Sequence, residues 1–567
     1  MGKDHIECFY YPSLSQKYLL LYDTSCIRQI LGRHVQATIS VQTETIHRHR
    51  VVVSYVRRKG FPVNGRVYGN RCMIQSSPES QGGIPPHQFG ILAGPLLAGL
   101  MFFLLPESLP GSARTLAAIL TWVVVMWITE PIPLPITALL GCGLCVLAGL
   151  GTMKSVFAAF AHPIIFLFIG SFFIAEALSV HGLDRRFGNW LLSRKWVGSN
   201  PIRIMMALSL AVAGMSMWIS NTAATAVMLP IALGVLRALR QSKHNMGTFE
   251  TGFLLCLAYG AGIGGVATLI GTPPNLIGVG LLAQQAHVTI SFDQWLLIGL
   301  PLAGVMLIVM FTLLYWLHSP PSHSSFHKVS PFLKITASTP WTRGEQYAFG
   351  VFVLAVFLWV FPAILSIWFE ADHAVVQWVR SHLPKELVPI FASGLLFLLP
   401  LNLRQGKFTL SWKEAANIHW GTILLFGGGI AFGELMVKTE LAHAIGQGMV
   451  DMFGIQSVWS LTGVAILTAL VLTELASNTA ATSMIVPVLI AIAHTANFSP
   501  VPPVLAACMA ASLAFVLPVS TPPNAIVYGT GRIPILRMVQ AGLMLDVIGG
   551  VLIWCALRIL GPLLGIE

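Results

Sequence analysis

Apolar stretches about as long as a lipid bilayer is thick recur along this chain from residue 89 onward. Examples are Phe89 to Leu105, Trp295 to Leu317 and Phe349 to Phe369, and a helix needs ~20 residues to cross the hydrocarbon core. Hydrophobic residues make up 55% of the chain and charged residues 10%, which excludes a soluble globular protein of ordinary composition. The sequence therefore predicts an all-α polytopic membrane protein.

The first 88 residues have a different composition. Lys and Arg outnumber Asp and Glu there, and no apolar run reaches the length of a helix. The segment also lacks the apolar core and small-residue cleavage site of a signal peptide. We expect a poorly ordered basic N-terminal tail, or a segment outside the expressed protein if synthesis starts at Met73, rather than a separate functional domain.

The net charge of +11 points to an anionic membrane surface rather than to nucleic acid, because the basic residues flank the apolar spans. The eight Cys follow no regular spacing. Cys142 and Cys145 form a CxxC inside an apolar span, where packing is expected rather than redox or metal chemistry.

Lys and Arg mark the loops that are expected on the cytoplasmic side. Basic residues both precede and follow the apolar segment 204–236, so both of its ends are predicted inside. A polar Ser220-Asn221-Thr222 interrupts this segment, which favours a re-entrant hairpin over one crossing. The same count predicts a second, outside hairpin at about 457–496 and a total of about eleven transmembrane spans.

An internal repeat relates the two halves of the chain. Residues 220–225 (SNTAAT) recur letter for letter at 477–482, and each copy has a Pro ten residues after its Ser. Downstream, GTPPN at 271–275 corresponds to STPPN at 520–524. By the loop count the two copies enter the membrane from opposite sides, and such inverted repeats are typical of secondary transporters.

The paired prolines of each TPPN predict a broken helix, because they remove amide donors and clash with the preceding turn. Lipid tolerates a broken backbone only where protein or a water-filled cavity surrounds it, so both breaks are candidate site positions. The predicted organisation is a basic tail (1–88), a first span (89–111), repeat 1 with the inside hairpin (112–317), a cytoplasmic linker (318–345) and repeat 2 with the outside hairpin (346–567).

Each SNT begins the second arm of its hairpin, where helix caps lie and where the positive end of a helix dipole attracts anions. The first arm ends at the same tip and leaves carbonyl oxygens that suit Na⁺. Four residues before each SNT Ser is another hydroxyl, Ser216 or Thr473, one turn away on the same face. This repetition indicates paired cation sites.

The paired SNT and TPPN motifs closely resemble those of the divalent anion:sodium symporter family, which includes sodium-coupled dicarboxylate, citrate and sulfate carriers. The resemblance covers roughly residues 89–567. It implies a secondary active transporter, not an enzyme, that carries small divalent anions, most simply C4-dicarboxylates such as succinate or malate, with Na⁺ as the co-transported ion. It also implies an elevator-type homodimer in the cell (inner or plasma) membrane, with a cytoplasmic N-terminus and no nucleic-acid partner.

The resemblance also assigns residues to the sites. The substrate would be surrounded by Asn221, Thr222, Thr272, Pro273, Ser477, Asn478, Thr479, Thr521 and Pro522. One Na⁺ site would comprise Ser216, Ser220, Asn221 and Gly271, and the other Thr473, Ala476, Asn478 and Ser520. Ser520 departs from the small Gly or Ala expected at its position.

Alternatives remain within and outside this class. Proton coupling, dicarboxylate exchange without sodium, and sulfate or citrate as substrate are all compatible with the motifs. An ATP-driven pump is disfavoured because no G-x-x-x-x-G-K-[ST] occurs, and a membrane-embedded enzyme because no H-E-x-x-H occurs.

Acids inside the membrane are functional candidates. Glu176 and Glu434 occupy matching repeat positions and fit either structural pairing at a helix end or a proton or gating role, and Glu474 adjoins the second cation motif. His162 and His419 are expected to be structural residues at the membrane interface rather than coupling groups.

Overall fold

The computed structural model describes residues 4–10, 37–45, 48–55, 86–198, 200–241, 248–318, 340–369, 373–453 and 456–562. The chain forms two compact units, Met1–Gly83 and Ile84–Glu567. In the first unit, strands β1 (Asp4–Tyr10), β2 (Ala37–Thr45) and β3 (Arg48–Tyr55) form an antiparallel sheet in the order β1-β3-β2. Met73 lies outside the described residues, and the expectations of poor order and of a later start stay predictions.

The second unit is helical. Its first half contains α2 (Pro86–Leu104), α3 (Gly111–Thr129), α4 (Leu134–Leu147), α5 (Met153–Phe157), the 3-10 helix η1 (Ala158–Ala161), α6 (Pro163–Val180), α7 (Leu183–Leu192), α8 (Pro201–Ser216), α9 (Asn221–Gln241), α10 (Phe249–Ala267), α11 (Pro273–Gln285) and α12 (Phe292–Leu317).

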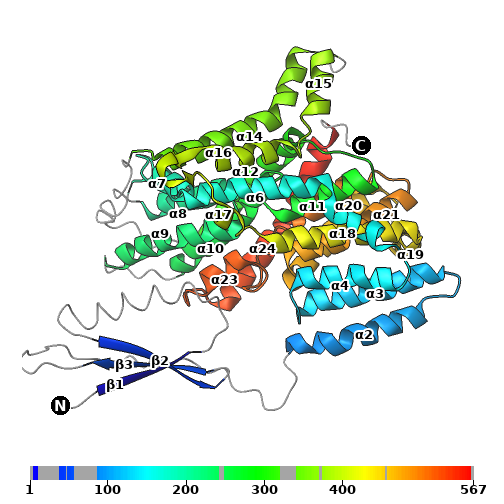
Figure 1. Ribbon diagram of the computed structural model, residues 1–567, viewed down its shortest axis with the longest axis horizontal. Coiled ribbons are helices and arrows are strands. Elements are labelled where there is room, and N and C mark those ends of the chain that lie inside the picture. Colours follow the sequence, from blue (N-terminus) through cyan, green and yellow to red (C-terminus); the bar gives the residue numbers. More distant parts are fainter. Residues whose placement is uncertain are drawn as a thin grey trace, which may run out of the picture. The chain divides into compact units, whose positions relative to one another are not determined.

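Its second half contains α14 (Arg343–Trp368), α15 (Ala374–His382), α16 (Val388–Leu398), β4 (Pro400–Asn402), η2 (Leu403–Gln405), β5 (Lys407–Phe408), α17 (Trp412–Ala415), α18 (Trp420–Lys438), α19 (Leu441–Phe453), α20 (Val458–Leu475), α21 (Asn478–Thr495), α22 (Val501–Ala510), α23 (Pro522–Tyr528) and α24 (Ile535–Leu560). In Figure 1, α15 projects beyond the other helices of this unit.

Within the described residues, nine helices are long and apolar enough to cross a membrane. The prediction of a helical polytopic membrane protein is therefore confirmed, and the described residues also include the strands β1 to β5. The count of eleven spans, the re-entrance of the hairpins and the side on which each lies stay predictions.

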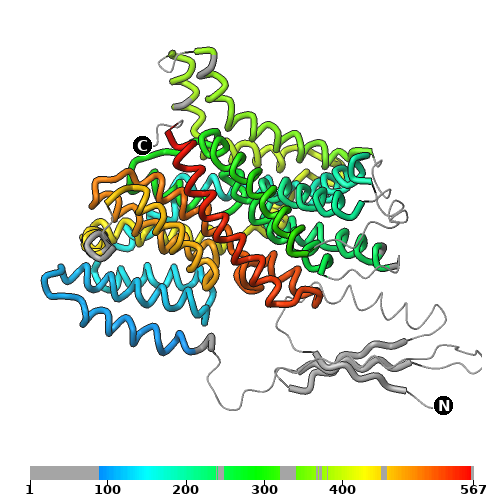
Figure 2. Tube along the Cα trace, turned by 180° about the vertical axis from the view of Figure 1, so that it is seen from behind, coloured from blue at the N-terminus to red at the C-terminus, as the bar shows by residue number. Residues whose placement is uncertain are grey.

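The internal repeat is visible in the order of the helices. The series α6 to α12 corresponds to α18 to α24, with a pair of antiparallel arms (α8 and α9, α20 and α21) followed by a broken helix (α10 and α11, α22 and α23). In each copy the helix before the break packs between the first hairpin arm and the last helix of the repeat: α10 against α8 and α12, and α22 against α20 and α24. Figure 2 shows the two copies from the opposite side.

Several short helices were not expected from the apolar runs. The helix α7 mixes charged and apolar residues, and exposes Phe187 and Trp190. A search for long apolar stretches passes over such helices, because their polar residues interrupt the run.

The helix α10 is buried along its whole length, and glycine allows its close approach to the first hairpin arm. A Cβ atom on Gly264 would lie 2.3 Å from the carbonyl oxygen of Ala213 in α8 and 2.6 Å from its Cα. Both atoms belong to the backbone, so no side-chain rotation would relieve the overlap. The contact fixes the distance between the hairpin and the helix that breaks beside its tip.

We expect Gly264→Ala to lower the free energy of unfolding by ~1–3 kcal/mol, the usual cost of overpacking a dense interior. The matched control is Gly304→Ala in α12, where an added Cβ meets nothing within 4 Å. Thermal unfolding of the purified variants in one detergent measures both. Equal stability of the two variants would mean that α8 and α10 separate easily at this contact.

Candidate functional site

Each hairpin tip contains a hydrogen bond from a hydroxyl to an asparagine. The Ser216 Oγ donates to Asn221 Oδ1 at 2.6 Å, and the Thr473 Oγ1 is 2.8 Å from Asn478 Oδ1. The side chains of Ser216 and Thr473 are both fully buried. The two repeats therefore share a side-chain geometry as well as a sequence, and the contact joins the last turn of the first arm to the first residue of the second.

The serine of each SNT caps the second arm. The Ser220 Oγ accepts from the amide of Ala223, and the Ser477 Oγ accepts from the amide of Ala480, each at 3.2 Å. This is the capping position that the motif predicts, and it fixes the N-terminus of α9 and of α21 at its tip. Free backbone amides at a helix N-terminus, together with the helix dipole, favour an anion there.

Thr222 and Thr479 follow these caps in the first turn of each second arm. Both are half-buried, and within the described residues neither hydroxyl makes a hydrogen bond. The later threonines differ: the Thr225 Oγ1 donates to the Asn221 carbonyl at 2.9 Å, and the Thr482 Oγ1 to the Asn478 carbonyl at 2.8 Å. The hydroxyls of Thr222 and Thr479 are thus available to a ligand, whereas those one turn later are satisfied within the helix.

Both TPPN motifs break their helices as the prolines predict: α10 ends at Ala267 and α11 begins at Pro273, while α22 ends at Ala510 and α23 begins at Pro522. The asparagine of each motif donates to two carbonyl oxygens that precede it in the chain. Asn275 Nδ2 donates to the Gly265 and Thr268 carbonyls at 3.0 and 2.8 Å.

Asn524 repeats this arrangement, because its Nδ2 donates to the Ala514 and Leu517 carbonyls at 2.9 and 3.0 Å. The Oδ1 atoms of Asn275 and Asn524 are buried and have no hydrogen-bond partner within the described residues. The site residues predicted from the sequence do not include these two asparagines, although their identical place in both TPPN copies was a signal that could have identified them.

In the first repeat the hairpin tip meets the break. A Cβ on Gly265 would lie 2.8 Å from Asn221 Oδ1 and 3.3 Å from Thr272 Cβ, and one on Gly271 would lie 2.6 Å from the Gly265 carbonyl oxygen. The Thr268 Oγ1 also donates to the carbonyl of Met217, in the tip. The structure thus brings together four of the residues predicted for this half: Ser216, Asn221, Gly271 and Thr272.

In the second repeat Glu474 joins the tip to the break. Its carboxylate accepts from the amides of Val516 and Leu517 at 2.9 and 3.0 Å, and from the hydroxyl of Ser520. Thr473 Oγ1 is also 2.6 Å from the carbonyl oxygen of Ala511, the residue after α22. Thr473, Asn478 and Ser520 are therefore assembled in one place, with the Ser520 hydroxyl directed to Glu474.

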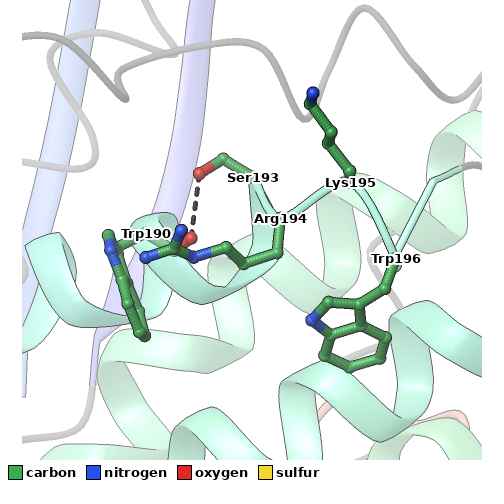
Figure 3. Close-up of a pocket in the computed structure, with 5 residues that line it drawn as sticks. All are labelled: Trp190, Ser193, Arg194, Lys195 and Trp196. Carbon is green, nitrogen blue, oxygen red and sulfur yellow. Dashed lines mark hydrogen bonds between the residues drawn. The ribbon is translucent and has the colours of Figure 1, made fainter.

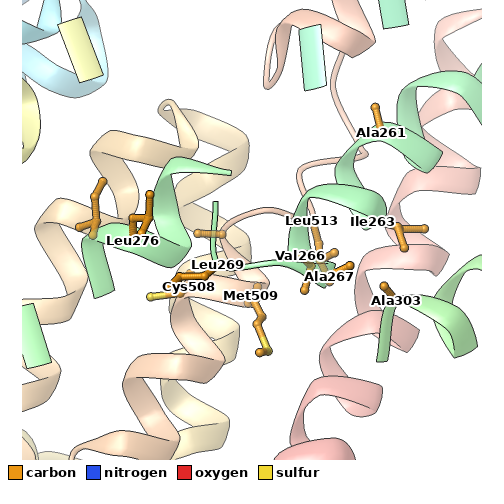
Figure 4. Close-up of a cluster of buried hydrophobic side chains, with 14 of the residues drawn as sticks. Ala261, Ile263, Val266, Ala267, Leu269, Leu276, Ala303, Cys508, Met509 and Leu513 are labelled. Carbon is orange, nitrogen blue, oxygen red and sulfur yellow. The ribbon is translucent and has the colours of Figure 1, made fainter. Parts of the chain in front are cut away.

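The two repeats also meet each other at the breaks. The helix α23 packs against α9 and α10, and α11 packs against α21 and α22. A Cβ on Gly278 in α11 would lie 2.0 Å from the Sγ of Cys508 in α22. Figure 4 shows Leu269 and Leu276 of the first repeat near Cys508 and Met509 of the second. Each short helix after a break is therefore held by the second hairpin arm of the opposite repeat. The remaining predicted residues lie at the hairpin tips and at the starts of the short helices: Ser220, Pro273, Ala476, Ser477, Thr521 and Pro522.

Three of the four other candidates, Glu434, His162 and His419, have structural contacts. Glu434 accepts from Gln284 of α11, whereas Glu176 makes no hydrogen bond within the described residues. The Nδ1 of His162 accepts from the amide of Ile164 at 3.3 Å and caps α6, and His419 packs edge-on against Phe172. The contact of Glu434 fits the structural pairing that was one alternative, and the roles of both acids stay predictions.

Known proteins are similar to this chain over nearly all of its helical part. The family described as "Sodium:sulfate symporter transmembrane region" matches residues 91–566. The sodium-dependent dicarboxylate transporter SdcS of Staphylococcus saprophyticus is 32% identical over 490 residues, which cover 84% of this chain and 92% of that protein. The SdcS of Staphylococcus aureus strain USA300 is 32% identical over 494 residues, with the same coverage.

A solved structure is similar in fold. The YdaH transporter of Alcanivorax borkumensis, described as having an unusual topology, aligns with a TM-score of 0.53 and 14% sequence identity over 84% of this chain and 98% of that one. At this identity the likeness concerns the fold alone. The family match over residues 91–566, taken with the duplicated tips and breaks, shows that the chain is a transporter rather than an enzyme and belongs to the divalent anion:sodium symporter family.

Proposed function

We propose that this protein is a secondary active transporter that carries C4-dicarboxylates such as succinate or malate into the cell together with Na⁺. The observation that carries the proposal is the duplicated tip, in which a buried hydroxyl, an asparagine and a capped helix N-terminus recur in both repeats. The relatives from both Staphylococcus species are described as sodium-dependent dicarboxylate transporters, which supports the same substrate class here.

The charge of the site supports the coupling to sodium. No Lys or Arg occurs in either SNT or either TPPN motif. A dianion would meet only neutral dipoles there, and taking an uncompensated charge out of water costs several kcal/mol even after relaxation. Bound Na⁺ offsets that cost, so each ion raises the affinity for the dianion, and the dianion raises the affinity for each ion by the same factor.

Distinct roles follow from the geometry of each tip. The available hydroxyls and first-turn amides of Thr222 and Thr479 are donors, and donors suit the carboxylates of the substrate. Ser216 and Thr473 each lie beside an asparagine oxygen, and Thr473 also lies beside the carbonyl oxygen of Ala511. Oxygen ligands of this kind suit a hard cation. The proposed substrate shell is the full set of substrate-binding residues predicted from the sequence. In the second cation site Ser520 contributes through its backbone, because its hydroxyl donates to Glu474.

The family resemblance extends the proposal to the assembly and the location. We propose a homodimer that works by an elevator-type movement in the plasma membrane, with a cytoplasmic N-terminus. Proton coupling, exchange without sodium, and sulfate or citrate as substrate are the alternatives that the experiment separates.

Uptake of labelled succinate into proteoliposomes tests the coupling. We expect uptake to depend on an inward Na⁺ gradient and to fall to the level of protein-free liposomes when choline replaces Na⁺. Unlabelled malate is expected to compete, and sulfate and citrate to compete more weakly. Equal uptake in choline without a pH gradient would overturn symport and leave exchange, whereas uptake driven by a proton gradient alone would establish proton coupling.

A further inference from the structure

A cavity of about 630 Å³ lies beside the tip of the first hairpin. It is bounded by α7, by the end of α8 with the tip that follows it, and by α14, and most of its lining is apolar. The lining includes Leu178, Phe187, Trp190, Met217, Trp218 and Phe352. Its volume falls within the range of ~300–1,000 Å³ that is usual for sites of small molecules, and its lining suits a hydrocarbon chain.

The charged residues of this cavity already have protein partners. Arg186 donates to the carboxylate of Glu345 at 2.7 Å, and its guanidinium lies 5.0 Å from the ring centre of Trp341. The carboxylate of Asp184 accepts from the amide of Arg185 at 2.6 Å. The inner part of the cavity therefore offers a ligand an apolar surface rather than a free charge.

A basic pocket adjoins the cavity at the end of α7. It is lined by Trp190, Ser193, Arg194, Lys195 and Trp196, as Figure 3 shows, and it shares Trp190 and Ser193 with the cavity. The Arg194 guanidinium lies 3.9 Å from the ring centre of Trp190, and Lys195 extends away from both indole rings. Within the described residues neither cation makes an ion pair.

The basic pocket and the apolar cavity together complement an amphiphile with a negatively charged headgroup. Two exposed cations between two tryptophans are typical of the membrane interface, where indole rings and basic side chains meet lipid headgroups. The loop count predicts this segment on the cytoplasmic side, where the leaflet carries anionic lipid. The apolar cavity opens from the same two residues, Trp190 and Ser193, so one molecule can place a headgroup on the cations and a chain in the cavity.

The cavity also borders the hairpin tip next to the proposed first cation site. Its lining includes Met217, whose carbonyl accepts from Thr268 in the break, and Met217 follows Ser216, which donates to Asn221. Trp218 packs edge-on against Phe352 of α14 at 4.8 Å, so the tip also contacts the opposite wall of the cavity. A chain that fills the cavity therefore restrains the tip that holds Ser216 and Asn221.

We propose that an anionic phospholipid of the cytoplasmic leaflet binds here, with its phosphate at Arg194 and Lys195 and one acyl chain in the cavity, and that it strengthens Na⁺ binding at the first hairpin tip. Binding itself is independent of the transport reaction. The effect on Na⁺ rests on the proposed function, so the two are measured separately.

The binding experiment uses purified full-length protein, with retained lipid measured by native mass spectrometry after exposure to phosphatidylcholine vesicles with or without phosphatidylglycerol. We expect phosphatidylglycerol to be retained in preference to phosphatidylcholine. The double variant Arg194→Gln/Lys195→Gln should weaken retention roughly 30-fold, from the usual contribution of two basic residues at a membrane surface. Glycerol 3-phosphate tests for a free anion: if it displaced the lipid fully, the acyl chain would have no part in binding.

Two matched controls separate this site from general charge and from local folding. Arg404→Gln/Lys407→Gln removes two cations from another loop that is predicted to be cytoplasmic, and should leave retention unchanged. Ser193→Phe should block the passage between pocket and cavity without altering charge. Its control is Ser381→Phe at the end of α15, because Ser381 Oγ donates to the Trp378 carbonyl at 3.0 Å as Ser193 Oγ does to that of Trp190 at 2.8 Å.

Equal retention by the Arg194/Lys195 variant and the wild type, or equal loss in the Arg404/Lys407 control, would overturn the lipid site. In proteoliposomes, phosphatidylglycerol should lower the Na⁺ concentration for half-maximal succinate uptake in the wild type and in Ser381→Phe, but not in Ser193→Phe. If lipid is retained and this Na⁺ dependence is unchanged, the regulatory part is wrong while the binding site stands. If neither the wild type nor any variant shows Na⁺-dependent uptake, the proposed function fails and the lipid-retention result is unaffected.

Discussion

Thr222→Ala and Thr479→Ala are each expected to weaken the apparent affinity for succinate roughly 10- to 150-fold, because each removes a hydrogen bond to a charged group, worth ~1.5–3 kcal/mol. The hydroxyls of these two threonines are unsatisfied within the described residues, so no hydrogen bond within the protein is lost with them. Concentration dependence of uptake at saturating Na⁺ measures the effect. Thr225→Ala and Thr482→Ala are the matched controls, since those hydroxyls donate to carbonyls of their own helices.

Ser216→Ala and Thr473→Ala are expected to act on sodium instead. Each should raise the Na⁺ concentration for half-maximal uptake and leave succinate affinity largely recovered when Na⁺ is saturating. Thr473→Ala should have the larger effect, because Thr473 Oγ1 lies at hydrogen-bond distance from both Asn478 Oδ1 and the Ala511 carbonyl, whereas the Ser216 hydroxyl bonds, among the described residues, to Asn221 alone. Succinate affinity must be measured at saturating Na⁺, because the two ligands are reciprocally coupled and weaker Na⁺ binding also weakens succinate binding. Rescue of the Thr222 and Thr479 variants by saturating Na⁺, without rescue of Ser216 and Thr473, would reverse the assigned roles.

The sequence was sufficient for the parts of the fold that depend on local rules. Paired prolines break a helix wherever they stand in its interior, so the breaks before α11 and α23 followed from Pro273 and Pro522. A Ser followed by a helical run is a cap in any fold, so the starts of α9 and α21 followed from Ser220 and Ser477. The internal repeat rested on several matched motifs in one order, which packing does not alter, and its inverted topology stays a prediction from the loop count.

Contacts between distant segments could not be predicted in this way. The close approach of Gly264 to Ala213 depends on how two helices pack, and a single glycine in an apolar run carries no sign of its neighbour. Asn275 in α11 donates to Gly265 in α10, and Asn524 in α23 donates to Ala514 within the second break. No periodicity in the sequence describes the path of either break. The short helix α7, which borders the cavity beside the first tip, was not predicted because charged residues interrupt its apolar run.

Glu474 shows most clearly why the two halves of the site differ. The repeat aligns Thr473 with Ser216, and therefore Glu474 with Met217. In the second repeat the carboxylate of Glu474 holds the break through three donors, while in the first the carbonyl of Met217 accepts from Thr268. Ser520 stands where the first repeat has Gly271, and its hydroxyl is the third donor to Glu474. Ser520, which departs from the family pattern, thus has a hydrogen-bond partner in Glu474, which also differs between the two repeats.

We expect Glu474→Leu to reduce succinate uptake more than ~100-fold, because it leaves the Val516 and Leu517 amides and the Ser520 hydroxyl without their acceptor, at ~1–3 kcal/mol for each unsatisfied group. Glu474→Gln retains one acceptor oxygen but turns an amide N–H₂ toward a donor, so its effect should be intermediate and should include a higher Na⁺ requirement. Glu107→Leu removes an exposed carboxylate from the loop after α2 and should leave uptake unchanged.

Two further measurements distinguish a specific loss of uptake in the Glu474 variants from a general failure to fold. Size-exclusion chromatography in detergent should give the same monodisperse peak for Glu474→Gln as for the wild type, since most of the buried core lies away from the break. Thr268→Val, which removes the corresponding contact in the first repeat, should also raise the Na⁺ requirement, because it frees the Met217 carbonyl beside Ser216. Wild-type uptake and Na⁺ dependence in Glu474→Leu would show that the second break keeps its shape without the carboxylate, and that its cation site depends on Thr473 and Asn478 alone.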